Sequence, residues 1–84
     1  MNLATIENYY ERLMELVNNH DVHSTHDENT EVPIDFQKDG NLLCVIWESR
    51  AGHVENSFYD LSLEKEINLL LNKINVVIED LKNS

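Results

Sequence analysis

Six consecutive apolar residues at positions 42–47 (Leu-Leu-Cys-Val-Ile-Trp) constrain the fold of this chain more than any other feature. A short apolar run with turn-forming residues on both sides is typical of a strand in the middle of a sheet. Side chains alternate between the two faces of a strand, so this run directs apolar residues both ways. The second face must therefore be covered by another part of the chain or be left for a partner.

An edge strand is expected just before this run. Residues 32–37 alternate apolar and polar side chains and include a proline, which is typical of a strand at the edge of a sheet. Asp39 and Gly40 suit the two central positions of a type I′ turn, which would join this strand to the next one over residues 42–48. This turn predicts three core-facing pairs: Phe36 with Leu43, Ile34 with Val45, and Val32 with Trp47. Three residues of the edge strand are then directed to the opposite face: Pro33, Asp35 and Gln37.

A third strand is expected over residues 53–59, after the turn-forming residues 49–52. If Glu48 pairs with His53, alternate residues of this strand take opposite faces: Val54 and Phe58 towards the core, Glu55 and Tyr59 away from it. Asn56 then also points into the core, which weakens this register because a buried amide needs hydrogen-bond partners.

Two helices are expected near the ends of the chain. Apolar residues recur every three or four positions over residues 3–18 and again over residues 62–82, which is the helical period. Asp60 and Ser62 are both candidates for the N-cap of the second helix. Residues 19–31 contain almost no apolar side chains and many that compete for backbone hydrogen bonds, so they predict a loop.

The order of these elements predicts a single α+β domain over residues 1–84. A helix, a three-stranded antiparallel meander and a second helix are expected to form two layers, with both helices on one face of the sheet. The other face would be bare, with an apolar centre and an acidic rim: Leu42, Cys44, Ile46 and Tyr59, surrounded by Asp35, Glu48 and Glu55. Such a patch is typical of a binding surface. Alternatively, the loop of residues 18–31 folds over this face.

The chain is strongly acidic, with 16 Asp and Glu against 6 Lys and Arg and a formal net charge of -10. This charge repels nucleic acids and anionic membranes, so we expect a basic protein partner and no direct contact with nucleic acid or membrane. The lone Cys44 cannot form an internal disulfide, and the sequence shows neither a signal-peptide pattern nor an apolar run of membrane-spanning length. A cytoplasmic location is therefore expected.

No residue pattern in the chain predicts catalysis or cofactor binding. Nucleophile–base spacings and glycine-rich phosphate loops are both missing, so we expect a protein that is not an enzyme and holds no cofactor. His20, His23 and His26 lie among acidic residues, but their spacing matches no standard zinc site, so a flexible polar loop is expected there. Protonation of these histidines near about pH 6 would lower the local acidity.

Carboxylates form a row on the first expected helix, because Glu7, Glu11 and Glu15 are spaced four residues apart. This row is either a solvated helix face or an anionic ridge that fits a basic groove. Further acids follow along the loop and the first strand: Asp21, Asp27, Glu28, Glu31, Asp35 and Asp39.

The small size, the excess of Asp, Glu and Asn, and the helix–hairpin–strand–helix order resemble the small acidic inhibitors carried by phages and mobile elements, particularly anti-CRISPR proteins and other DNA mimics. The resemblance implies that the protein blocks the nucleic-acid-binding surface of a host defence enzyme, in a bacterial or infected cell, by presenting carboxylates where phosphates would sit. The acids of the helix, the loop and the first strand would form the mimic. The alternatives are an immunity protein or antitoxin against a nuclease toxin, and a homodimeric structural or regulatory adaptor.

Overall fold

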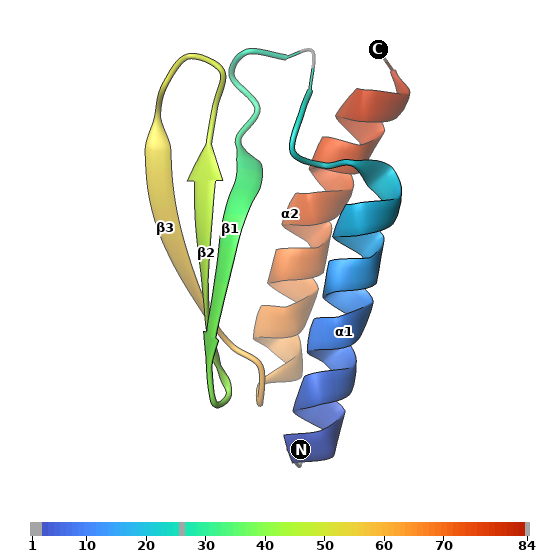
Figure 1. The fold of residues 1–84 in the computed structure, drawn as a ribbon, viewed down its shortest axis with the longest axis vertical. Coiled ribbons are helices and arrows are strands. Elements are labelled where there is room, and N and C mark those ends of the chain that lie inside the picture. Colours follow the sequence, from blue (N-terminus) through green and yellow to red (C-terminus); the bar gives the residue numbers. More distant parts are fainter. Residues whose placement is uncertain (1–2, 26, 84) are drawn as a thin grey trace.

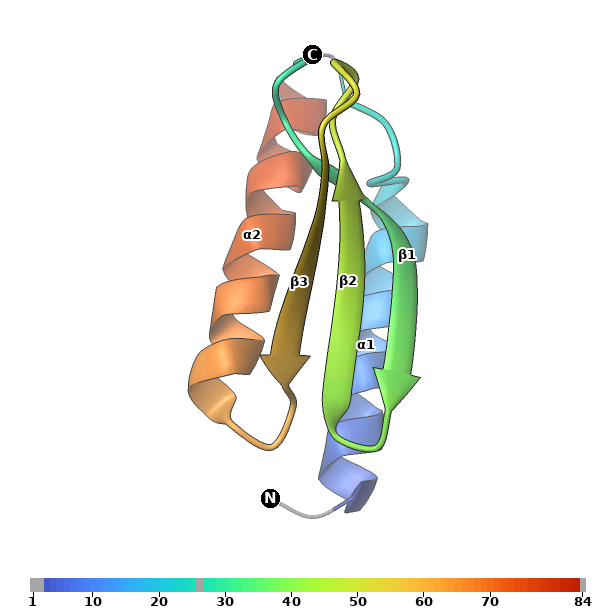
Figure 2. The same ribbon diagram turned by 90° about the vertical axis from the view of Figure 1, so that its left-hand side faces the viewer.

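The computed structural model describes residues 3–25 and 27–83 and arranges them in two layers, a sheet and a pair of helices (Figure 1). The elements follow in the order α1 (Leu3–His20), β1 (Val32–Asp39), β2 (Leu42–Glu48), β3 (Val54–Asp60) and α2 (Glu64–Lys82). The strands form one antiparallel sheet in the order β1-β2-β3, so the apolar strand β2 is central. Both helices lie on one face of the sheet (Figure 2), and the predicted α+β architecture is confirmed.

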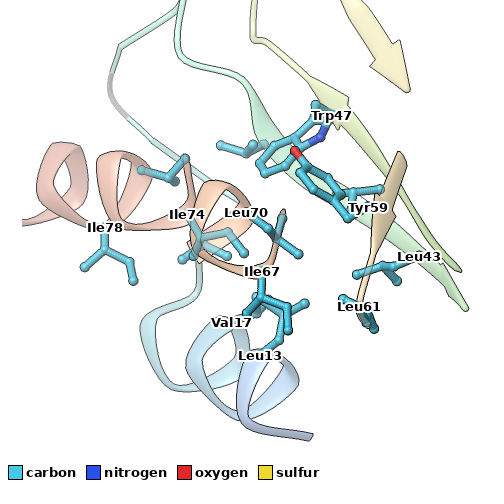
Figure 3. Packing of buried hydrophobic residues seen from close by; sticks show 14 of the residues in the cluster. Leu13, Val17, Leu43, Trp47, Tyr59, Leu61, Ile67, Leu70, Ile74 and Ile78 are labelled. Atoms are coloured by element: carbon cyan, nitrogen blue, oxygen red, sulfur yellow. The ribbon is translucent and has the colours of Figure 1, made fainter. Parts of the chain in front are cut away.

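The hydrophobic core fills the space between the sheet and the two helices (Figure 3). From β2, Leu43, Val45 and Trp47 are fully buried, as the alternation of that strand predicts. The helices contribute the buried apolar side of each periodic pattern, including Val17 from α1 and Ile74 from α2. Within the described residues, neither helix is long and apolar enough to cross a membrane.

The hairpin between β1 and β2 turns one residue later than predicted. Asp39 is still part of β1 and pairs with Leu42, so the turn residues are Gly40 and Asn41. Gly40 has a φ of +60°, whereas Asn41 is not among the described residues with positive φ. This combination fits a type II′ turn, because a type I′ turn needs positive φ at both central residues. The expected type I′ turn is therefore wrong. Phe36 pairs with Val45 instead of Leu43, but this shift by two residues keeps Phe36 on the predicted face.

A β-bulge near the beginning of β1 reverses the predicted exposure of Pro33 and Ile34, whereas Val32 is buried as predicted. Pro33 pairs with Trp47 and Asp35 pairs with Ile46. Because Ile46 and Trp47 are consecutive in β2, Ile34 is an extra residue of β1 without a partner of its own. Pro33 is consequently buried, whereas Ile34 is largely exposed, contrary to the prediction for both residues. A bulge fits this site because proline cannot donate a ladder hydrogen bond.

Strand β3 is paired one residue away from the predicted register. Leu43 lies opposite Tyr59 and Glu48 lies opposite Val54, so every β3 side chain faces the side opposite to the predicted one. Asn56 thereby points away from the core, which removes the weakness of the predicted register. The shift arises in the turn, where Ser49 N donates to His53 O at 2.9 Å and the three residues between them form the loop.

Helix α2 begins two residues later than predicted, at Glu64, and no side chain caps it. Asp60 Oδ1 instead accepts hydrogen bonds from the backbone N of Ser62 at 2.9 Å and from its hydroxyl at 2.6 Å. Glu66 Oε1 accepts from the Asp60 backbone N at 3.2 Å. The two expected capping residues therefore fix the turn between β3 and α2.

Candidate protein-binding surface

The face of the sheet turned away from the helices is open in the described structure (Figure 2). Leu42, Cys44 and Ile46 of β2 point to this face, as predicted, and Leu42 is 47% exposed. Phe58 lies directly opposite Cys44 on β3 and is 61% exposed. With Val54 further along β3, these residues form the outer patch: Leu42, Cys44, Ile46, Val54 and Phe58. The register shift of β3 therefore makes this face more apolar than predicted.

Tyr59 and Glu55, both predicted for this patch, lie at β3 positions that face the helices. The Tyr59 ring belongs to the core beside Trp47 (Figure 3). Burial raises the pKa of the Tyr59 hydroxyl, although a hydrogen bond with Ser57 lowers it in part. Glu55 is exposed at the sheet edge. Sequence reasoning missed Val54 and Phe58 as patch residues for the same reason, because it reversed the faces of β3.

Four carboxylates on outward-facing strand positions surround the outer patch, and we refer to them as the acidic rim: Asp35, Asp39, Glu48 and Asp60. Asp39 and Asp60 both pair with Leu42, and Asp35 pairs with Ile46. None of the outward-facing positions of the described sheet carries Lys or Arg. The face therefore combines an apolar centre with negative charge alone.

Hydrogen bonds hold two of the rim carboxylates in place. The Asp35 carboxylate accepts from the backbone N of Phe36 and from Gln37 Nε2, each at 2.9 Å. The hydrogen bonds from the Ser62 hydroxyl and then from its backbone N lower the pKa of Asp60. Asn41 Nδ2 also donates to Asp60 at 3.0 Å. These carboxylates have fixed positions and do not depend on a flexible loop.

The carboxylate row on α1 lies on the helix layer, away from the acidic rim. Glu7 forms an ion pair with Lys38 of β1, whose ammonium also lies 5.7 Å from the centre of the Tyr10 ring. Glu11 and Glu15 are exposed, without an ion pair in the part of the chain that the structure describes. The predicted row of three carboxylates therefore offers two to a partner, because the first one joins α1 to the sheet.

The loop between α1 and β1 is anchored to the end of the sheet. Val22 is fully buried, and the His23 side chain bonds through Nδ1 to Pro33 O. Glu28 O accepts from Ala51 N at 3.2 Å. These contacts place the loop beside the β2–β3 turn, so it does not fold over the outer patch. Four acidic residues of this loop were predicted to contact a partner. Asp21, Asp27 and Glu28 are exposed, whereas Glu31 is half-buried.

The half-buried Glu31 borders a small polar hollow of about 280 Å³ near the same end of the sheet. Its Oε2 atom is buried and has no hydrogen-bond partner among the described residues. His53 and Glu55 also line this hollow. No three His, Cys, Asp or Glu side chains of the described chain are placed to hold a metal ion, and His26 lies outside the described residues.

A second hollow, of about 270 Å³, lies between the two helices. Its lining is mainly apolar and includes Tyr9 and Leu16 of α1 and Leu71 of α2. The helical repeat in the sequence did not predict this hollow. The available signal was that Tyr9, Leu16 and Leu71 are large and mainly apolar residues next to the positions of the helical repeat, which places them at the margin of the helix pair.

Comparisons of the chain with protein-family models, with curated protein sequences and with solved structures found no match. The outer patch with its acidic rim is therefore the candidate functional site on physical grounds alone.

Proposed function

We propose that this protein is a non-enzymatic inhibitor that binds a basic, nucleic-acid-handling protein through the outer patch and the acidic rim. The observation that carries the proposal is an exposed apolar patch on the sheet, bordered by carboxylates and free of Lys and Arg. Carboxylates at fixed positions can occupy the sites on a basic groove that phosphates would otherwise fill. Blocking such a groove requires no chemistry from the inhibitor itself.

The arrangement matches the anatomy of a protein–protein interface. Such interfaces combine an apolar, water-excluding centre with a polar rim, and aromatic side chains commonly contribute most of the binding energy. Phe58 is the largest exposed side chain of the outer patch, which makes it the expected anchor. The rim carboxylates would accelerate association with a basic partner and exclude acidic ones.

The negative charge of the rim distinguishes between two possible partners of the apolar patch, a second copy of this chain and a basic protein. Two copies of this chain would oppose the same acidic rims across the patch, which disfavours a homodimer through this face. A cationic groove has the complementary charge. An immunity protein against a nuclease toxin would use the same surface, so the identity of the captured protein separates this alternative from a phage-type inhibitor.

The test compares the immobilised wild-type protein with Phe58→Lys in affinity capture from bacterial lysates at low and high salt. Leu63→Lys is the matched control, because Leu63 is a similarly exposed apolar residue outside the patch. We expect a basic nucleic-acid-binding protein to be captured by the wild type and by Leu63→Lys at low salt, and to be lost at high salt or with Phe58→Lys. Equal capture by all three proteins would contradict the proposal.

A further inference from the structure

The two edges of the sheet differ in how they resist the addition of another strand. Edge strand β1 carries Pro33, a bulge and Lys38, which are common devices against edge-to-edge pairing. Edge strand β3 carries neither proline nor lysine, and it pairs with β2 without interruption from Val54 to Asp60. The structure therefore protects the β1 edge by proline, a bulge and lysine, whereas β3 carries only the charges of Glu55 and Asp60 and keeps a regular edge.

The β2–β3 ladder identifies the backbone groups at this free edge. Ser49 N to His53 O, at 2.9 Å, and Leu61 N to Asn41 O, at 2.7 Å, mark the two ends of the ladder. Hydrogen-bonded and non-hydrogen-bonded pairs alternate in antiparallel strands, so residues 55, 57 and 59 bond to β2. The N–H and C=O groups of residues 54, 56 and 58 consequently point to the free edge. No backbone hydrogen bond joins these groups to another segment of the described chain.

The same three residues, 54, 56 and 58, direct their side chains to the outer face, so the free edge and the outer patch form one continuous surface. An added strand would place alternate side chains beside Val54 and Phe58. The Glu66 carboxylate accepts from the Asp60 backbone N and thereby closes the far end of the edge. The open stretch is thus about three residue pairs long and ends beside the acidic rim.

Helix α2 extends beyond β3 on the side away from β2 (Figure 2), so it would cover the inner face of an added strand. Leu69 and Val76, which are 55% and 63% exposed, are seven residues apart and share one side of α2. That side is nearly opposite Leu71, which faces the hollow towards α1. It also includes Lys73, whose ammonium lies 4.2 Å from the centre of the Trp47 ring. This flank of α2, with two exposed apolar residues and Lys73, therefore overlooks the free edge of β3.

We propose that the partner docks by adding an extended polypeptide segment to the free edge of β3, under the flank of α2. This inference rests on the proposed function and specifies the structural form of the partner. Unpaired, alternating N–H and C=O groups are complementary to an extended chain and to few other ligands. The bound segment would carry apolar side chains where it lies beside Val54 and Phe58. It would carry basic side chains where it lies near Glu55 and the acidic rim. A second copy paired through β3 would bring its own α2 into the same space, which disfavours it.

The test uses a phage-displayed library of random linear peptides selected on the wild-type protein. Asn56→Pro removes one N–H at the free edge and leaves the β2 ladder intact, because proline is tolerated where the N–H faces solvent. Asn56→Ser is the matched control, since it changes the same side chain and keeps the N–H. We expect the selected peptides to bind Asn56→Ser like the wild type and Asn56→Pro at least about tenfold more weakly.

Amide hydrogen exchange of the wild-type protein provides a second readout that does not depend on a variant. Peptide binding should slow exchange at residues 54, 56 and 58 and leave residues 55, 57 and 59 unchanged, because the latter already bond to β2. Equal binding to both Asn56 variants, failure to select any peptide, or unchanged exchange would each overturn the inference. A wild-type dimer in light scattering that Asn56→Pro converts to a monomer would identify a second copy as the occupant and overturn it as well.

The lysate experiment separates this inference from the proposed function. If Phe58→Lys loses the captured protein and Asn56→Pro retains it, the outer patch binds the partner without strand addition and only the inference fails. If Asn56→Pro loses the captured protein and Phe58→Lys retains it, the free edge binds the partner and the outer patch is not its contact site.

Discussion

Single residues of the sheet have opposite roles according to the face that they occupy. Trp47 and Phe58 are aromatic residues on neighbouring strands, yet Trp47 is fully buried and Phe58 is mostly exposed. The first belongs to the core, and the second is available to a partner. Stability and binding should therefore respond to different substitutions of similar chemistry.

Replacing Trp47 with alanine should destabilise the fold by about 3–5 kcal/mol, because it leaves a large cavity in the core. Phe58→Ala, the control, should change the free energy of unfolding by no more than about 0.5 kcal/mol, as is usual for exposed positions. Chemical denaturation of the two variants and the wild type measures both effects. Similar losses in the two variants would contradict the assignment of core and outer faces.

The buried hydroxyl of Tyr59 should make stability fall at high pH. Burial raises the pKa of this phenol, so the folded protein keeps its proton when the unfolded chain begins to ionise near about pH 10. The contribution is complete below that pH and is lost as the pH rises through the folded-state pKa. Urea unfolding between neutral and strongly alkaline pH should show a smaller loss for Tyr59→Phe than for the wild type. An identical pH dependence would mean that Tyr59 ionises equally easily in both states.

At the scale of the elements, sequence periodicity is sufficient to place helices and strands but not to pair them. Strand β2 has its predicted bounds, because its apolar run is local information. The register of β3 instead depends on the number of residues in the turn after Ser49, and one residue reverses every side chain. The bulge in β1 has a similar effect on Pro33 and Ile34. These pairing details could not be read from alternation alone.

The same limit explains which parts of the candidate site could be predicted. Leu42, Cys44 and Ile46 were predicted because they alternate with the buried residues of a strand whose central place is clear. Val54 and Phe58 were assigned to the core because the predicted register gave them inward positions. Asn56 was the signal for the correct register, since an amide is costly to bury without partners. The ion pair between Glu7 and Lys38 joins two elements that are distant in the sequence, so no local sequence pattern could predict it.

At the scale of the whole molecule, intrachain contacts use much of the small amount of positive charge. Lys38 pairs with Glu7, Lys73 lies over Trp47, and Lys82 lies 3.6 Å from Glu79. Many carboxylates lie in three groups, the acidic rim, the α1 row and the loop, and further exposed ones lie at Glu55 and on α2. The acidic rim is the only one of these groups that surrounds an exposed apolar patch on the sheet, which gives it a role beyond general acidity.

The whole-molecule prediction compares two variants with the same change in net charge. Asp35→Asn with Asp39→Asn removes two rim carboxylates, and Glu11→Gln with Glu15→Gln removes two from α1. Both should fold, because the four carboxylates are exposed. Against the protein captured from the lysate, the rim variant should associate more slowly and show a weaker salt dependence, since rim charges mainly set the association rate. The α1 variant should show a smaller change, because its carboxylates lie on the other layer.

Stopped-flow or surface-based kinetics at two salt concentrations measure the association rates of both variants. Equal effects would show that net charge alone steers the partner, and a larger effect of the α1 variant would move the contact surface to the helices.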